Sequence, residues 1–393
     1  MMCLVIPQGR LFMWMAATYI WTEPWQTHND LCDGQQHLKT TYSTLINQPK
    51  KMKTLTCTTP GTFEYSTTDK PQLQTDQAII RIKRVGICGT DLHAFEGTQP
   101  FFNYPRVLGH ELSGELVEID GNTDFTIGEK VTFIPYFNCG ECIACRMSKP
   151  NCCVKMQVCG VHVDGGMREY LSVPSRTLLH GEGLSYDELA LVEPLAIGAH
   201  GVRRADIQPG EFVLVIGAGP IGLGTMEFAK IAGAKVIALD INEDRLAFCK
   251  EKLGVDFAIN ALSPNVTQQL NEITDGDMPT VVIDATGNQK AINNAINYMA
   301  HGARFVLIGL QKGDLIFNHP EFHKRESTLM SSRNATIQDF EHVIQSMKAG
   351  LVNPTNYITH RVAFENVKDE FETWLDPKNG VIKAMVELDK SSV

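Results

Sequence analysis

The sequence lacks the features that mark membrane, nucleic-acid-binding and disulfide-rich proteins. No apolar run reaches the roughly 18 residues that suggest a membrane span. The net charge is −10 and there is no basic block, so we expect neither a membrane nor a nucleic acid as partner. Eleven cysteines in 393 residues are too few for a scaffold held by disulfides. What is left is the broad class of globular proteins.

Length and composition predict two globular domains. A chain of 393 residues is longer than one ordinary domain needs. Hydrophobic residues make up 43% of it, which provides enough apolar surface for two cores. Its 32 glycines suit the tight turns between strands and helices of an α/β protein.

Residues 1–51 differ from the rest of the chain. They contain Trp14, Trp21 and Trp25, three of the four tryptophans, and from residue 26 onward they are polar without periodicity. Residues 52–57 read as an edge strand that opens a domain. We interpret residues 1–51 as a non-domain N-terminal extension, with a natural start at Met52 as the favoured explanation. A targeting segment and a genuine extra element are the alternatives.

Four cysteines follow the pattern C-x2-C-x2-C-x7-C, namely Cys139, Cys142, Cys145 and Cys153. Thiolates at this spacing can converge on one ion, and closed four-thiolate sites are typical of structural zinc. An iron–sulfur cluster is disfavoured because the ferredoxin pattern has a shorter last gap and a proline after it. Disulfides at such short spacing would be strained. Cys152 stays an alternative ligand because it adjoins Cys153.

A second motif predicts dinucleotide binding. An apolar strand at 212–216 leads directly into Gly217-Ala-Gly219-Pro-Ile-Gly222, then a helical pattern at 223–232 and a strand at 235–239 that ends in Asp240. Strand, glycine turn, helix, strand and acid form the complete fingerprint. The residues predicted to bind the cofactor are Gly217, Gly219, Pro220, Ile221, Gly222, Asp240 and Arg245.

The predicted cofactor is NAD. Gly219 lets the backbone approach a pyrophosphate, and the following helix N-terminus faces the phosphates. Asp240 would accept hydrogen bonds from the adenosine ribose and would repel a 2′-phosphate. No arginine follows Asp240 directly, since Arg245 comes five residues later.

Strands and helices continue to alternate after the glycine motif. Strands are expected at 280–284 and 304–308 and a helix at 288–299, with Asn242 as the N-cap of an earlier helix. Residues 202–335 are therefore predicted to form a doubly wound parallel sheet.

Three further pieces suggest a catalytic metal site. Cys88 lies in Gly86-Ile-Cys88-Gly-Thr90-Asp91-Leu-His93, His110 in Gly109-His110-Glu111, and Glu193 in Val192-Glu193-Pro194. A thiolate, an imidazole and a carboxylate from separate loops leave a fourth zinc position open, as catalysis requires. The alternatives are that these residues belong to the core and that Glu193 caps a helix.

With these motifs, residues 53–393 resemble the zinc-dependent medium-chain dehydrogenase/reductase family. The Cys/His/Glu combination is similar to the polyol and threonine dehydrogenase branch. Residues 99–106, 284–289 and 322–336 are similar to bacterial L-galactonate and L-gulonate 5-dehydrogenases. The resemblance implies a GroES-like β-barrel catalytic domain over 52–201, completed by 336–393, with a Rossmann domain over 202–335 between them.

The resemblance also assigns roles to residues. It implies a catalytic zinc on Cys88, His110 and Glu193, with Glu111 as an alternative or neighbouring catalytic carboxylate and with Thr90 and His93 as a proton relay. Together with the cysteine cluster this gives two zinc ions per chain. Candidates to hold a substrate carboxylate are Arg106, Arg333 and Asn334, since arginine pairs bidentately with carboxylates.

The expected activity is NAD-dependent, zinc-dependent oxidation of a secondary hydroxyl in a sugar acid or polyol. L-Threonine 3-dehydrogenase and sorbitol-type dehydrogenase are the alternative activities, and a non-catalytic redox sensor is the alternative of another class. We expect a cytoplasmic homo-oligomer, a dimer or a tetramer.

Overall fold

The computed structural model describes residues 51–100, 102–121 and 124–388. The extension predicted at 1–51 lies outside these ranges except for Lys51, which already belongs to the first strand. Residues 50–393 form one compact unit. None of the helices in the described ranges is long and apolar enough to cross a membrane.

A six-stranded parallel sheet forms the nucleotide-binding half, as predicted. Its strands are β10 (Phe212–Ile216), β11 (Lys235–Asp240), β12 (Phe257–Asn260), β13 (Val281–Asp284), β14 (Arg304–Leu307) and β15 (Thr328–Ser331). The strand order is β12-β11-β10-β13-β14-β15. The order reverses between β10 and β13, which is where doubly wound sheets bind their ligands.

The helices of this half are α6 (Pro220–Ile231), α7 (Glu243–Phe248), α8 (Val266–Ile273), α9 (Gln289–Ala295) and α10 (His319–Lys324). The prediction that Asn242 caps a helix is confirmed, because its side chain accepts a hydrogen bond from the Arg245 amide at the start of α7. The helix predicted at 288–299 is shorter. It leaves the α conformation after Ala295 and continues as the 3-10 turn Ile296–Tyr298.

The other half is built on a mostly antiparallel sheet. Its strands are β3 (Gln77–Gly86), β4 (Glu111–Ile119), β5 (Lys130–Phe133), β8 (Tyr170–Pro174), β9 (Leu178–His180), β16 (Ile358–Ala363) and β17 (Lys383–Glu387). The order is β16-β17-β3-β4-β5-β9, with β8 also on β3. Two small hairpins accompany it: β1 (Lys51–Thr59) with β2 (Thr62–Asp69), and β6 (Tyr136–Phe137) with β7 (Gln157–Val158).

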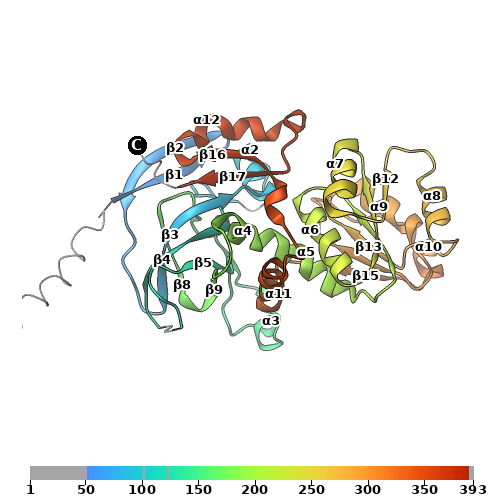
Figure 1. Cartoon of the computed structure of the whole chain (residues 1–393), viewed down its shortest axis with the longest axis horizontal. Helices are drawn as coiled ribbons and strands as arrows, with labels where there is room; N and C mark the ends of the chain where they lie inside the picture. Colours follow the sequence, from blue (N-terminus) through green and yellow to red (C-terminus); the bar gives the residue numbers. More distant parts are fainter. Residues whose placement is uncertain (1–50, 101, 122–123, 389–393) are drawn as a thin grey trace, which may run out of the picture. The chain divides into compact units, whose positions relative to one another are not determined.

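Strands from both sides of the parallel sheet in the sequence therefore share this second sheet. Figure 1 shows the red strands β16 and β17 beside strands coloured blue. The pairing is antiparallel between β17 and β3, with Met385 opposite Gly86. This sheet and the parallel sheet confirm the predicted fold class, a barrel-type catalytic domain with a Rossmann domain inserted into the sequence.

The remaining helices are α2 (Gly89–Glu96), α3 (Ile143–Arg146), α4 (Tyr186–Ala190), α5 (Val192–Ala205), α11 (Ile337–Lys348) and α12 (Val367–Glu370). The domain boundary predicted after residue 201 falls inside α5. Glu193 is in the first turn of α5 rather than at its N-cap, which is Leu191.

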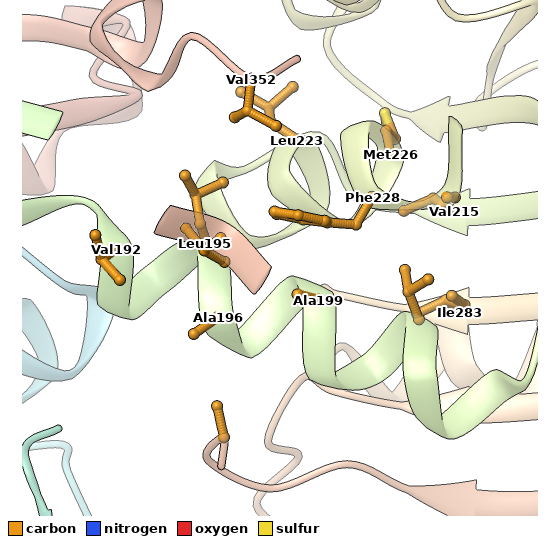
Figure 2. Packing of buried hydrophobic residues seen from close by; sticks show 14 of the residues in the cluster. Val192, Leu195, Ala196, Ala199, Val215, Leu223, Met226, Phe228, Ile283 and Val352 are labelled. Carbon is orange, nitrogen blue, oxygen red and sulfur yellow. The ribbon is translucent and has the colours of Figure 1, made fainter. Parts of the chain in front are cut away.

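Helix α5 packs closely on α6. A Cβ at Gly198 would lie 2.8 Å from the Thr225 backbone nitrogen, so this position needs glycine. A Cβ at Gly224 would lie 2.7 Å from a Leu195 methyl carbon, so the Leu195 side chain would have to shift. Figure 2 shows the buried side chains around this crossing, among them Val192, Leu195, Ala196, Ala199, Leu223, Met226 and Phe228. Because Glu193 lies on α5, this packing fixes the position of a predicted metal ligand.

Candidate active site and metal centres

The four predicted zinc-binding cysteines come together in one lobe. The sulfur atoms of Cys139, Cys142, Cys145 and Cys153 all lie within 4.8 Å of one another. Cys152 is exposed and is not part of this group, which removes it as an alternative ligand in this arrangement.

Backbone amides prepare these cysteines for a cation. Hydrogen bonds from the amides of Cys145 and Val154 lower the pKa of Cys142 to about 6. Backbone hydrogen bonds likewise lower the pKa of Cys139. The amides of Cys139 and Lys155 donate to the Cys153 sulfur at 3.3 and 3.4 Å. Such donors favour the thiolate forms of Cys139 and Cys142, and four converging cysteine sulfurs fit a closed tetrahedral zinc site.

A buried aspartate joins the loops that carry Cys88 and His110. Asp91 accepts hydrogen bonds from the amides of Cys88 at 2.9 Å and of Gly109 at 3.1 Å, and it is 1% exposed. The His110 Nδ1 is buried and lies 3.8 Å from an Asp91 oxygen, and it has no hydrogen-bond partner among the described residues. Burial opposes a charge on His110, but Asp91 and Cys88 raise its pKa well above the ordinary value.

Two glutamates lie near this histidine with different partners. The Tyr136 hydroxyl donates to Glu193, and burial raises the pKa of Glu193 to about 7. Both oxygens of Glu111 accept from the ammonium of Lys383 at 2.6 Å, and Lys383 also donates to the Ile87 carbonyl. All four side chains are buried. The two carboxylates are therefore not equivalent, since one faces a phenol and the other an ammonium.

The donor atoms of this second group are more widely spaced than those of the cysteine lobe. Among the described residues, the cysteine lobe is the one group in which three or more potential ligand atoms all lie within 4.8 Å. The charges of Cys88 and Glu193 nevertheless both act on His110. The structure thus brings Cys88, His110, Glu193 and Glu111 to one buried region, with an unpartnered imidazole nitrogen among them.

The predicted relay residues lie on one helix that leads away from Cys88. Thr90 and His93 are three residues apart on α2 and so share a face. The His93 side chain is 52% exposed, and its Nδ1 lies 3.3 Å from the Thr98 hydroxyl and from a Glu96 oxygen. Thr90 is half-buried. The helix thus leads from the half-buried Cys88 to the exposed His93.

The glycine turn has the shape that a pyrophosphate site needs. Gly217 has φ +101°, and a Cβ at Gly222 would collide with the Gly217 carbonyl oxygen. By contrast, a Cβ at Gly219 would meet nothing within 4 Å, so the backbone there is open to a ligand. Pro220 and Ile221 open α6 directly behind Gly219.

Asp240 ends β11 beside this turn. Its oxygens accept hydrogen bonds from the Ala218 amide at 2.6 Å and the Asn242 amide at 2.9 Å. Arg245 donates instead to the Val381 carbonyl at 3.4 Å. The acid is thus placed next to the turn, whereas the arginine has a partner in the C-terminal segment.

The three residues predicted to hold a substrate carboxylate differ in how far their hydrogen-bond donors are already used. Arg106 donates to Asp164 at 3.2 Å, its side chain is 18% exposed, and its buried Nε has no partner. The Asn334 amide donates to the Asn151 carbonyl at 3.2 Å. Arg333 is exposed, and its guanidinium has no partner within the described part of the chain. Arg333 is therefore the candidate with free donors.

Sequence reasoning missed Tyr136 and Lys383. Tyr136 is 57 residues from Glu193, and Lys383 is 272 residues from Glu111. Neither residue belongs to a motif, so no local signal pointed to them.

Comparison with known proteins agrees with this geometry. Residues 74–182 match the model for the alcohol dehydrogenase GroES-like domain, and residues 220–349 match the model for zinc-binding dehydrogenases. The chain is 44% identical over 339 residues to L-galactonate-5-dehydrogenase of Escherichia coli K12. The aligned region covers 85% of this chain and 98% of the relative. It is 31% identical to a sorbitol dehydrogenase of Halalkalibacterium halodurans, over 79% of this chain and 92% of the relative.

A solved structure has the same fold. The alcohol dehydrogenase RspB of Escherichia coli CFT073, crystallised with its cofactor NADH, superposes with a TM-score of 0.81 at 30% identity. The match covers 86% of this chain and all of RspB. The chain thus belongs to the zinc-binding alcohol dehydrogenase family and is an oxidoreductase that acts on CH–OH groups, as its motifs predicted.

Proposed function

We propose that this enzyme uses NAD to oxidise a secondary hydroxyl of a six-carbon sugar acid such as L-galactonate or L-gulonate. The observation that carries the proposal is that Cys88 and Glu193 lie near the buried imidazole of His110 and that their charges act on it. The chain that carries this group is 44% identical to an L-galactonate-5-dehydrogenase.

Two sets of residues are suited to hold zinc. Cys139, Cys142, Cys145 and Cys153 would hold a structural ion, and Cys88, His110 and Glu193 a catalytic one, with Glu111 as the second carboxylate beside it. The unpartnered His110 nitrogen and the backbone-stabilised thiolates fit such ions. When bound, the catalytic zinc supplies Lewis acidity toward the substrate hydroxyl, and NAD takes up the hydride.

The residues of α2 would move the proton. The Thr90 hydroxyl would accept the proton of the substrate hydroxyl and pass on its own, and the exposed His93 imidazole would exchange the proton with solvent. The reaction then balances: alcohol and NAD⁺ give ketone, NADH and one proton.

The preference for NAD over NADP would come from Asp240. Its carboxylate lies beside the glycine turn, where a 2′-phosphate would be repelled. Arg245 is turned toward Val381 and so would not offset that repulsion, although it stays a predicted cofactor contact. The NADH complex of RspB supports this cofactor for the fold.

Arg106, Arg333 and Asn334 are the residues that we propose to hold the carboxylate of such a substrate, and the Arg333 side chain is exposed. The competing substrates are sorbitol, suggested by the sorbitol dehydrogenase relatives, and L-threonine. The test is NADH production across L-galactonate, L-gulonate, sorbitol and L-threonine. We expect the highest kcat/KM for an aldonate. A higher value for sorbitol or L-threonine would overturn the proposed substrate and leave the family assignment intact.

We also propose that the enzyme is a cytoplasmic homo-oligomer, a dimer or a tetramer. The nine cysteines in the described ranges are all free thiols, which supports a reducing compartment. Light scattering coupled to size-exclusion chromatography would measure the oligomer, and a monomeric mass would refute it.

A further inference from the structure

Two buried polar side chains of α5 are held by residues of the cysteine lobe and of the strand that leads into it. Glu193 and His200 are seven residues apart, which is almost two helical turns, so they lie on the same face of α5. The Tyr136 hydroxyl donates to Glu193 Oε1. The Asn151 side-chain nitrogen Nδ2 lies 3.2 Å from His200 Nε2. All four side chains are buried, so this face of α5 is fixed at two points.

Both Tyr136 and Asn151 are tied to the four-cysteine site. Strand β6 contains Tyr136 and pairs with β7, with Tyr136 opposite Val158. Cys139 follows β6 and Cys153 precedes β7, and the Cys139 amide donates to the Cys153 sulfur at 3.3 Å. Asn151 lies in the same loop, two residues before Cys153. A zinc ion bound by the cysteines would therefore hold both residues in place.

The contact between Asn151 and His200 has a defined direction. An amide nitrogen can only donate, so His200 Nε2 accepts and the ring proton is on Nδ1. That Nδ1 lies 2.8 Å from Asp339 Oδ2, and Arg203 donates to Asp339 Oδ1 at 2.7 Å. The second N–H of the Asn151 side chain donates to the Arg333 carbonyl at 3.0 Å. His200 is thus held between the cysteine lobe and the first turn of α11, which contains Asp339.

We propose that the cysteine lobe positions the catalytic carboxylate Glu193, directly through the Tyr136 hydroxyl and along α5 through Asn151 and His200. The phenol takes one carboxylate oxygen, Oε1, and leaves the other for a metal. Because a hydrogen bond of this kind orients a metal-binding carboxylate, its loss weakens metal binding. Tyr136 and Asn151 are therefore positioning residues, and an ion in the lobe strengthens binding of the catalytic ion. The inference rests on the proposed function, because it needs a catalytic zinc on Glu193.

The first test removes the phenol hydroxyl alone. Tyr136→Phe keeps the ring, which packs edge-on against Phe340 with the ring centroids 6.1 Å apart. The dissociation constant of the catalytic zinc should rise about 10- to 100-fold. Competition with a chromogenic chelator measures it, and His110→Ala, which keeps only the ion of the lobe, identifies the step that belongs to that ion. The matched control is Tyr357→Phe, which takes a hydroxyl from Glu227 and should leave the zinc affinity unchanged.

The second test removes the ion from the lobe. Cys139→Ser should raise the dissociation constant of the remaining catalytic zinc, whereas Cys152→Ser, whose side chain is exposed and outside the cluster, should not. Asn151→Ala keeps all four thiols and should raise it by a smaller factor than Tyr136→Phe, because it acts on α5 through His200. If Cys139→Ser does not fold, Asn151→Ala tests the role of the lobe in its place.

The outcomes separate this inference from the proposed function. A zinc content that His110→Ala leaves unchanged refutes the proposed catalytic site, and this inference with it. A catalytic ion that is lost in His110→Ala but is bound equally tightly by the parent and by Tyr136→Phe refutes the inference alone. Equal losses of affinity in Tyr136→Phe and Tyr357→Phe also refute it, since they would reflect a general loosening of the fold.

Discussion

The Lys383 ammonium lies 2.6 Å from each carboxylate oxygen of Glu111, and both side chains are almost fully buried. The lysine starts β17 and the glutamate starts β4, with β3 between the two strands. The C-terminal strand thus supplies the cation that neutralises the acid next to His110.

Breaking this pair should destabilise the fold strongly. Lys383→Met leaves a buried carboxylate without a partner, and we expect a loss of about 3–5 kcal/mol in the free energy of unfolding. Urea unfolding at pH 7 measures it. The double variant Lys383→Met/Glu111→Gln should recover most of the loss because both charges are gone.

The control for that experiment is Lys53→Met, whose ion pair with Glu365 is more than half exposed on both sides. It should cost at most about 1 kcal/mol. Equal effects of Lys383→Met and Lys53→Met would mean that the buried pair does not stabilise the sheet.

Metal analysis should find two zinc ions per chain. Cys139→Ser removes one of four converging thiolates and should reduce the content to about one. Cys152→Ser is the matched control and should keep two, because Cys152 is exposed and outside the cluster. A content near one that Cys139→Ser leaves unchanged would eliminate the structural site.

Cofactor preference should depend on Asp240. Asp240→Ala should reduce the ratio of kcat/KM for NAD to kcat/KM for NADP. The change should come mainly from the KM for cofactor, because the variant no longer repels a 2′-phosphate. The KM for NAD should also rise, since the Ala218 amide of the glycine turn loses the carboxylate that accepts its hydrogen bond. Asp256→Ala is the control, as Asp256 binds the Val236 amide at the start of β11, away from the turn. A parent enzyme that prefers NADP would contradict the role of Asp240.

The stability of the fold should fall between about pH 4.5 and pH 7 because of Glu227. Burial raises the pKa of Glu227 to about 7 from 4.5, with Lys230 opposing, and the Tyr357 hydroxyl contacts the carboxylate. In this range the unfolded chain releases a proton that the folded chain keeps, so unfolding becomes easier as pH rises. The decrease should be about 2–3 kcal/mol.

Glu227→Gln should remove that part of the pH dependence. The amide oxygen can still accept from Tyr357, so the contact is kept without a titrating group. Urea unfolding at pH 5 and pH 7.5 measures the difference for both proteins. If the variant and the parent lose the same stability between the two pH values, Glu227 is ionised in the fold.

The glycine turn and the cysteine cluster were predicted correctly because each is a local motif. Gly217, Gly219 and Gly222 lie within six residues, and the four cysteines within fifteen, so their spacing alone specifies the geometry. Apolar runs also predicted β10, β11, β13 and β14, and β10 and β13 are buried almost throughout. The strands β12 and β15 were not predicted, because they are less buried and lack such a run. The helix from 288 was predicted too long, since periodicity does not separate an α-helix from the 3-10 turn that follows Ala295.

The parts of the candidate site that the sequence could not predict depend on contacts between distant segments of the chain. Lys383 reaches Glu111 only once β17 has joined β3, and Tyr136 contacts Glu193 from strand β6, 57 residues earlier in the chain. Arg106 is four residues before His110, yet its partner Asp164 comes from a loop 58 residues away. The closeness of Arg106 to His110 in sequence therefore overstated its availability to a substrate.

The pairing of β17 with β3 also determines the order in which the two sheets can form during translation. All six strands of the parallel sheet lie between residues 212 and 331, so that sheet can form while the chain is still on the ribosome. In the sheet of the catalytic half, β3 stays unpaired on the side of β17 until residues 383–387 have left the ribosome. Glu111 consequently stays without its buried cation until Lys383 has been translated and has left the ribosome.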